Sequence, residues 1–334
     1  MIRFYTQNEN GIGRLVGIES IETTPLKDIF WVDLLTPDVG ELQCAEQLCG
    51  IEMPTQDEMR EIEATSRLYT EDGARFMTTT VLGRVDTDEP TLSEITFILK
   101  GARIVTIRHS DSYSFRVFSH QLLRSKQITR DQVFIGLLET IVDRQADVLE
   151  RFGTDLDSVS KKVFSHRHTQ RDRKDRGKKE PATHELRLVL EELGSIGDLI
   201  TRQRDCLVNL LRMLTFASNE EALDPNMETL YSRLRPISRD VNSLSEYASF
   251  LSNKINFMLD AVLGLINIEQ NEIVKIFTVA SVIFMPATLI ASIYGMNFRN
   301  MPEIDNPYGY IGALCLMFLS IVGPLVFFRI KRFI

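Results

Sequence analysis

Two uncharged stretches decide the fold: IFTVASVIFMPATLIASIY at Ile276–Tyr294 and YGYIGALCLMFLSIVGPLVFF at Tyr308–Phe328. Each has about 20 residues, the length at which an α-helix crosses the ~30 Å hydrocarbon core of a bilayer. A buried hairpin in a soluble core would also be apolar. Because the two stretches follow each other closely, we expect two transmembrane helices, 276–294 and 308–328, joined by a loop at 295–307.

The first stretch carries a stripe of polar, small or soft residues at alternating spacings of three and four. The stripe comprises Asn271, Val274, Thr278, Ser281, Met285, Thr288, Ser292 and Gly295. This spacing places its members on one face of a helix. Such a face either packs closely against another transmembrane helix or lines a water-filled pathway. Because two spans cannot enclose a pore, the second interpretation requires several copies of the chain around an axis.

The charge of the chain lies almost entirely before residue 276, and its net value is −8. The residues before the first span are therefore expected to form a water-soluble region large enough for two domains. No apolar segment follows Met1, so no cleavable signal peptide is expected. The tail 329–334 is basic, whereas the loop between the spans contains a single basic residue, Arg299. The positive-inside rule then predicts that both termini are cytoplasmic.

Several function classes receive no support from the sequence. The four cysteines, Cys44, Cys49, Cys206 and Cys315, form no CxxC pair and are expected to act as small apolar residues. No nucleophile–base pair, phosphate-binding loop or metal cluster stands out, so an enzyme is not expected. A negative net charge without interleaved aromatic residues argues against nucleic-acid binding.

Residues 1–125 are predicted to form an α/β domain. A helix is expected between Thr36-Pro37 and Gly50, and a second one over 56–64, where its acidic residues include Asp57 and Glu61. This acidic helix is either a solvated face or a weak cation site. Runs typical of strands are Ile2–Tyr5, Phe30–Leu34, Arg75–Leu82, Ile95–Leu99 and Arg103–Ile107.

In residues 126–222 the apolar residues recur at helical spacing, which predicts a helical hairpin. Its two helices are expected to cover 131–164 and 183–216. The tip, 161–179, is rich in Lys and Arg and also contains His166 and His168. We interpret this tip as a solvated turn rather than a metal site, with contact to anionic lipid head groups as the alternative.

Residues 223–275 are predicted to form a long stalk helix that continues into the first span. Pro236 suits the first turn of this helix, and no proline follows before Pro286. The polar stripe continues backward from the span through Asn267, Gly264, Asp260, Phe257, Asn253 and Glu246. On this face, Asp260 is either an exposed charge or part of a carboxylate ring that attracts cations.

The signature Tyr294-Gly295-Met296-Asn297, followed by Met301-Pro302-Glu303, lies between two spans and closely resembles the CorA magnesium channel family. Residues 263–271 and Phe30–Leu34 resemble it as well. The resemblance implies an α+β membrane protein of the inner (plasma) membrane that assembles as a funnel-shaped homopentamer. Each subunit would contain a cytoplasmic α/β domain, a helical hairpin, a stalk helix that becomes the pore helix, and an outer second span.

The function implied by this resemblance is Mg²⁺ influx, with Co²⁺ and Ni²⁺ as further substrates, driven by membrane potential and closed by intracellular Mg²⁺. Mg²⁺ is then substrate and regulatory ligand, and no other cofactor is expected. Gly295, Met296 and Asn297 would form the selectivity filter, and the stripe with Asp260 would line the pore. A zinc transporter of the same superfamily and a two-span sensor or scaffold are the alternatives.

Two departures from the family pattern limit which residue roles can be transferred from the family to this chain. Pro236 stands where a regulatory aspartate is found in the family, so Asp240, Glu246, Asp57 and Glu61 are the candidate regulatory ligands. Arg299 stands in the outer loop where an acidic or neutral residue is common. Glu303 and Asp305 remain to attract cations at the outer mouth.

Overall fold

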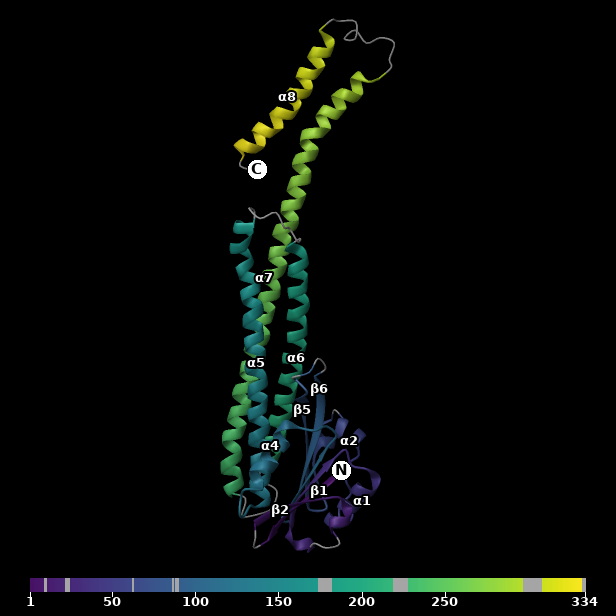
Figure 1. The fold of residues 1–334 in the computed structure, drawn as a ribbon, viewed down its shortest axis with the longest axis vertical. Helices are drawn as coiled ribbons and strands as arrows, with labels where there is room; N and C mark the ends of the chain where they lie inside the picture. The colour runs from purple at the N-terminus through teal and green to yellow at the C-terminus, as the bar shows by residue number, and fades with distance from the viewer. Residues whose placement is uncertain are drawn as a thin grey trace. The chain divides into compact units, whose positions relative to one another are not determined.

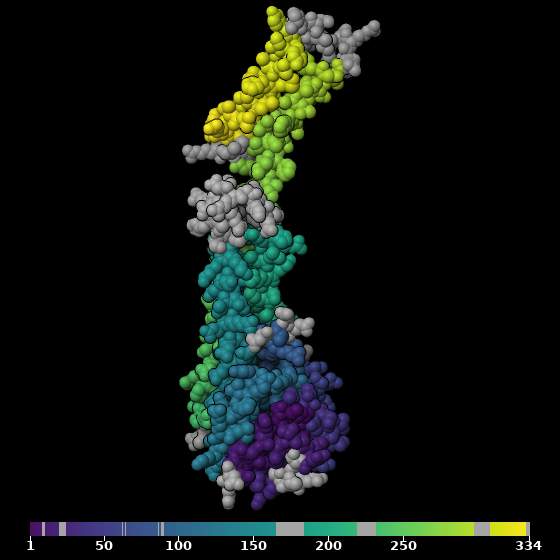
Figure 2. Space-filling model, in the orientation of Figure 1, coloured from purple at the N-terminus to yellow at the C-terminus, as the bar shows by residue number. Residues whose placement is uncertain are grey.

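The computed structural model describes residues 1–8, 11–21, 25–61, 63–85, 87, 90–173, 182–218, 228–296 and 308–331. It divides into two compact units. The first unit contains residues 1–178 and 188–259, and the second contains residues 179–187 and 260–334. Figure 1 shows the elements of both units along the chain, and Figure 2 shows the same chain as a space-filling view in the same colours.

A seven-stranded sheet forms the core of the N-terminal part of the first unit, with the strand order β2-β1-β3-β7-β6-β5-β4. The pair β3–β7 is parallel, and the other neighbours are antiparallel. The strands are β1 (Ile2–Asn8), β2 (Gly11–Val16), β3 (Ile29–Leu35), β4 (Leu68–Glu71), β5 (Ala74–Gly83), β6 (Thr91–Lys100) and β7 (Arg103–Arg108).

Helices cover both faces of this sheet. On one face, α1 (Val39–Cys49) and α2 (Gln56–Arg60) contribute Ala45, Cys49 and Met59 to a buried apolar cluster with the strands. On the other face, α4 (Tyr113–Leu122) and α5 (Arg130–Arg173) pack through aromatic contacts with Trp31 and Phe97. Short elements η1 (Ile18–Ile21), η2 (Leu26–Asp28) and α3 (Ala64–Arg67) complete the unit.

The acidic helix is shorter than predicted. Thr55 caps α2 as expected, but the helix ends at Arg60, and Glu61 already has an extended backbone. The Glu61 amide donates to the Glu58 carbonyl at 3.2 Å, which closes the helix with a tight turn. The Met59 carbonyl accepts from Arg67 Nη2 at 3.3 Å. Because Arg67 occupies the carbonyl that a further helical turn would need, the prediction of a helix over 56–64 is corrected to 56–60.

Three long helices form the rest of the first unit: α5, α6 (Ala182–Ala217) and the first part of α7 (Glu228–Tyr294). Figure 1 shows them side by side. Along α7 a buried seam follows the alternating spacing of a heptad repeat, and its fully buried members are Leu234, Ile237, Val241, Ala248, Leu251, Ile255 and Met258. These helices are therefore held together by an apolar seam of the coiled-coil kind.

The helix α7 contains 67 residues without a break. Pro236, which was predicted for the first turn, lies inside the helix, because the helix begins at Glu228. A proline in a helix interior removes one backbone hydrogen bond. Its neighbours Leu234 and Ile237 are buried at 0% and 4% exposure. Packing of these two residues in the seam keeps the chain helical on both sides of the proline.

The second unit contains the C-terminal part of α7 and the helix α8 (Gly309–Ile330). Both are long and apolar enough to cross a membrane, with mean hydropathies of 2.1 and 2.4 in their most apolar windows. In α7 the half-buried residues Val279, Ile283, Ala287 and Ile290 lie on one face. In α8 the covered face includes Gly309, Ala313, Met317, Ser320, Pro324 and Phe328. These are the least exposed faces of the two helices.

Candidate ion-conduction site

The predicted polar stripe of α7 does not coincide with the covered face of that helix. Asn271, Val274, Thr278, Ser281, Met285, Thr288 and Ser292 are all exposed in the single chain. For Val274 and Met285 the exposed fractions are 60% and 69%. The stripe is therefore not on the face that packs against α8, and it is uncovered in the single chain.

The threonines of the stripe present hydrogen-bond acceptors outward. Thr278 Oγ1 donates its proton to the Val274 carbonyl at 2.8 Å, and Thr288 Oγ1 donates to the Phe284 carbonyl at 2.8 Å. Because each hydroxyl proton is used inside the helix, the oxygen lone pairs are what each side chain offers to a neighbour. Acceptor oxygens of this kind suit the water shell of a hydrated cation.

Asp260 lies on α7 about three helical turns before Asn271. Its side chain is exposed and has no ion-pair partner among the residues that the structure describes. Phe257 and Asn267, in the same register, are exposed as well, and Gly264 between them is half-buried. The exposed positions of this register thus continue beyond the apolar part of the helix.

The C-terminal end of α7 carries the first residues of the predicted filter. The Gly295 amide donates to the Ala291 carbonyl at 3.0 Å, and the Met296 amide donates to the Ile293 carbonyl at 3.2 Å. Met296 is 47% exposed. The remaining predicted residues of the filter and the outer mouth, Asn297, Glu303 and Asp305, lie outside the described residues.

The four predicted regulatory ligands belong to two different elements. Asp57 lies in α2 and Glu61 directly follows it, whereas Asp240 and Glu246 lie in α7. All four are exposed, and Glu246 Oε1 accepts a hydrogen bond from Asn242 Nδ2 at 2.9 Å. Within the described part of one chain, no three His, Cys, Asp or Glu side chains are grouped to hold a metal ion. Their regulatory role stays a prediction that requires ligands from more than one chain.

The two buried cysteines have the environment of apolar residues. Cys49 and Cys206 are buried, and burial raises the pKa of the Cys206 thiol to about 12. Burial also raises the pKa of Cys49. Both side chains are therefore neutral thiols at physiological pH, and thiolate is the form that binds metal.

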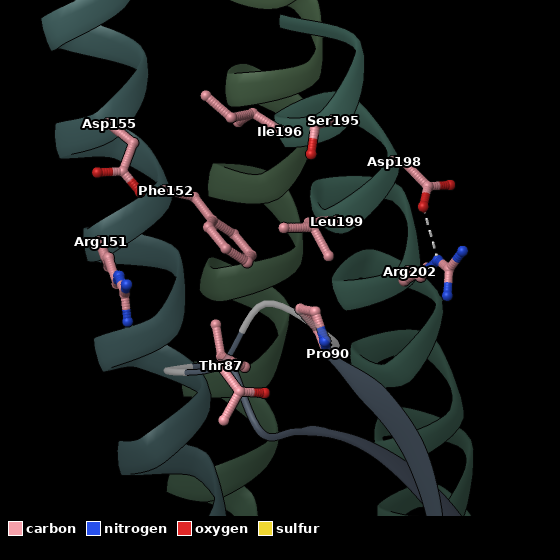
Figure 3. A pocket seen from close by; sticks show the side chains of 11 residues that line it. Thr87, Pro90, Arg151, Phe152, Asp155, Ser195, Ile196, Asp198, Leu199 and Arg202 are labelled. Carbon is pink, nitrogen blue, oxygen red and sulfur yellow. Dashed lines mark ion pairs between the residues drawn. The ribbon is translucent and has the colours of Figure 1, made fainter. Parts of the chain in front are cut away.

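A groove of about 370 Å³ lies between α5, α6 and the connection from β5 to β6 (Figure 3). Asp155 and Arg151 extend from α5, while Asp198 and Arg202 extend from α6. Asp198 Oδ2 pairs with Arg202 Nε at 2.8 Å. Among the described residues that line this groove, two acidic and two basic side chains balance each other, so this part of the lining does not have the charge of a cation site.

Sequence reasoning missed two aromatic residues on the surface of α7. Tyr247 and Phe250 are 39% and 57% exposed. The signal was present, because these residues fall between the positions of the buried seam that runs from Leu234 to Met258. The helix α7 thus carries a buried apolar seam and an exposed polar stripe, and the sequence analysis identified only the polar stripe.

Comparison with known proteins shows the family. Residues 27–332 match the description "CorA-like Mg²⁺ transporter protein". The chain belongs to the CorA-like Mg²⁺ transporter family. It is 31% identical over 318 residues to the magnesium transport protein CorA of Haemophilus ducreyi, with 95% of each chain covered. It is 30% identical over 324 residues to the CorA of Escherichia coli K12, with 96% of this chain and 97% of the relative covered.

The fold agrees with this family. The complete structure of the CorA magnesium transporter from Methanocaldococcus jannaschii superposes with a TM-score of 0.77 at 20% identity, and 98% of each chain is covered. The predicted fold class is thereby confirmed: an N-terminal α/β sheet domain, a long helix and a second apolar helix. The chain therefore belongs to a family of transporters and not to a family of enzymes.

Proposed function

We propose that several copies of this chain form a pathway for Mg²⁺ influx across the inner (plasma) membrane, with both termini in the cytoplasm. The observation that carries this proposal is the exposed polar stripe of α7, which faces away from the residues that α8 covers. A chain with two spans that packed only on itself would have no use for a polar face along an apolar helix. Family membership supports Mg²⁺ as the transported ion.

The stripe provides the groups that a hydrated cation needs. Mg²⁺ prefers octahedral oxygen ligands and loses its water reluctantly, so a pathway that accepts the hydrated ion avoids a high dehydration barrier. Asp260 would attract cations at one end of the stripe, and Thr278 and Thr288 would accept hydrogen bonds from the water shell. Met285 would form an apolar ring that closes the pathway by excluding water. The filter would be formed by Gly295, Met296 and Asn297.

The driving force would be the membrane potential. Moving one charge through 100 mV changes the free energy by ~2.3 kcal/mol, and the effect is doubled for a divalent ion. Asp240, Glu246, Asp57 and Glu61 would bind intracellular Mg²⁺ between subunits and favour the closed state. Co²⁺ and Ni²⁺, which also accept oxygen and nitrogen ligands in octahedral geometry, are proposed as further substrates.

A zinc transporter is the second candidate function within the superfamily. The intact Gly295-Met296-Asn297 signature and the following Met301-Pro302-Glu303 favour magnesium over zinc. A sensor or scaffold with two spans receives less support, because it does not require the exposed stripe.

Mg²⁺ uptake by proteoliposomes tests the proposal. The vesicles would contain a Mg²⁺-sensitive dye and carry an imposed inside-negative potential. We expect uptake by the wild-type chain, loss of uptake in Asn297→Ala, and no uptake when the potential is abolished. Absence of uptake by correctly assembled wild-type protein would exclude the magnesium function, and uptake of Zn²⁺ in the same vesicles would favour the second candidate.

A further inference from the structure

One aromatic side chain of α7 lies in line with the polar stripe and has no assigned role in the proposed pathway. Phe257 is 63% exposed, although Ile255 and Met258 beside it are buried in the seam. It makes no ring contact among the described residues, whereas Phe250, one heptad earlier, stacks on Tyr247 with 6.2 Å between the ring centres. Most of the Phe257 side chain is therefore uncovered in the single chain.

Phe257 occupies the heptad position that runs through the stripe. Steps of seven residues lead from it through Gly264 and Asn271 to Met285. Seven residues nearly complete two turns of an α-helix, so each step rotates the side chain by only about 20°. Phe257 is therefore within about 40° of Asn271 around the axis of α7. The buried Ile255 lies about 160° away, at 100° per residue, so the seam and Phe257 are on opposite sides of the helix.

The neighbours of Phe257 on this side of α7 favour cations. Asp260 lies three residues later and Asn253 four residues earlier, and both are exposed. Lys254 is the only basic residue in this part of the helix. Its ammonium group pairs with Asp157 of α5, so its positive charge is held on the side of the hairpin. The side of α7 that carries Phe257 thus presents carboxylate and amide oxygens beside an aromatic ring.

We propose that Phe257 forms an aromatic constriction of the Mg²⁺ pathway, next to the Asp260 carboxylates and on the side away from the membrane span. This inference rests on the proposed pathway, in which several copies of the chain place the same register of α7 around one axis. At 1.5 Å per residue, Phe257 lies about 42 Å from Met285 along the helix. The pathway then contains two separate apolar rings.

The constriction limits how fast ions leave the Asp260 carboxylates. A ring of carboxylates attracts hydrated cations, and a narrow apolar ring resists their passage because it excludes water. Conduction requires that an ion is attracted strongly enough to enter and is still able to leave. Because Phe257 follows Asp260 on the exit side, the size and polarity of this side chain set the rate of that last step.

A packing role for Phe257 is the alternative that the experiment must exclude. Aromatic rings on a helix surface also stabilise contacts between subunits, and a change of size in either direction then weakens the assembly. A constriction behaves differently, because a smaller polar side chain opens it and a larger apolar side chain narrows it. The constriction therefore predicts opposite effects of the two changes, whereas packing predicts the same effect.

Potential-driven Mg²⁺ uptake by proteoliposomes that contain the assembled full-length chain tests this proposal. We expect Phe257→Asn to raise the initial rate of uptake about threefold or more, and Phe257→Trp to lower it by a similar factor. The matched controls are Phe164→Asn and Phe164→Trp, which make the same changes at a phenylalanine of α5 that is 48% exposed. Both controls should take up Mg²⁺ at the wild-type rate. Size-exclusion chromatography of each variant measures the size of the assembly.

The outcomes separate this inference from the proposed function. The constriction is wrong if Phe257→Asn does not raise uptake, or if the two Phe257 substitutions change uptake in the same direction. It is also wrong if the Phe164 substitutions produce the same changes. Uptake by the wild type at a rate that all four variants share would retain the pathway and reject only the constriction. Absence of uptake by the assembled wild-type chain would instead contradict the proposed pathway itself.

Discussion

Asp33 and Arg108 form a buried ion pair that joins the two parallel strands of the sheet. Arg108 Nη2 lies 2.7 Å from Asp33 Oδ2, and Arg108 Nε donates to Asp33 Oδ1 at 3.0 Å. Both side chains are 1% exposed. Burial lowers the pKa of Arg108, but the Asp33 carboxylate outweighs burial and holds this pKa above its ordinary value. The pair is therefore charged and links β3 to β7 across the middle of the sheet.

Removal of one partner of this pair should destabilise the first unit strongly. Asp33→Ala leaves the buried Arg108 guanidinium with only its longer contact to Asp111 Oδ1 at 3.5 Å, and loss of a buried partner typically reduces the free energy of unfolding by about 3–5 kcal/mol. Trp31 is the only tryptophan in the chain and stacks on Tyr5 in the same core, so its fluorescence reports unfolding of this sheet.

Asp198→Ala is the control for Asp33→Ala. It removes a carboxylate from the exposed pair with Arg202 and should change the free energy of unfolding by less than about 1 kcal/mol. Equal effects of the two substitutions in denaturant titrations would contradict the structural role of Asp33.

The contact between α4 and α5 should depend on a glycine. A Cβ at Gly136 would lie 2.2 Å from Phe118 Cε2, and Phe118 is itself buried in the core. Gly136→Ala should therefore destabilise the chain by about 1–3 kcal/mol through overpacking. Gly194→Ala is the matched control, because its Cβ would meet no atom within 4 Å and alanine favours the helix.

Thermal unfolding of both glycine variants checks this expectation. Gly136→Ala should lower the midpoint, and Gly194→Ala should leave it unchanged or raise it. A Gly136→Ala variant as stable as the wild type would show that Phe118 does not pack as the structure places it.

The ion pair between Asp157 of α5 and Lys254 of α7 should make a pH-dependent contribution to stability. The hydrogen bond and the charge of Lys254 lower the pKa of Asp157 below its ordinary value of 3.8. A carboxyl group with a lowered folded pKa stabilises the fold above its unfolded pKa and loses this effect as the pH falls through the folded value. The contribution is therefore complete at neutral pH, begins to fall near pH 3.8 and is lost as the pH drops further through the lowered pKa.

Comparison of Asp157→Asn with the wild type at two pH values measures this contribution. The variant should melt slightly lower than the wild type at pH 6, and the difference should vanish in strong acid. Because the pair is exposed, the effect should also shrink with added salt. A difference that is the same at both pH values would assign the stabilisation to something other than the charge of Asp157.

Much of the fold followed from patterns that are local in the sequence. The five predicted strands are confirmed within β1, β3, β5, β6 and β7, because their alternation and β-branched residues are strong signals. The two missed strands lie at the edges of the sheet. β2, with the sequence GIGRLV, contains two glycines, and β4 has only four residues. Both are stabilised mainly by pairing with one neighbour, which the sequence does not show.

Features that depend on contacts between distant segments were harder to predict from the sequence. The helix α4 was missed, although Phe115, Phe118 and Leu122 recur at helical spacing. The polar stripe could be identified because all its members lie on one helix. The groove between α5 and α6 could not, because Pro90, Asp155 and Asp198 come from separate elements that only the folded chain brings together.

The central proposal is tested most directly by the accessibility of single cysteines along α7. Potential-driven Mg²⁺ uptake would be measured before and after treatment with a cationic, water-soluble thiol reagent. The background would be Cys315→Ala, which removes the one exposed cysteine among the described residues. Ser281→Cys places a thiol on the exposed stripe, and Ala280→Cys places one on a half-buried position next to it. If the stripe lines the pathway, the reagent will block uptake in Ser281→Cys and leave Ala280→Cys active. Equal block of both, or block of Ala280→Cys alone, would contradict the assignment.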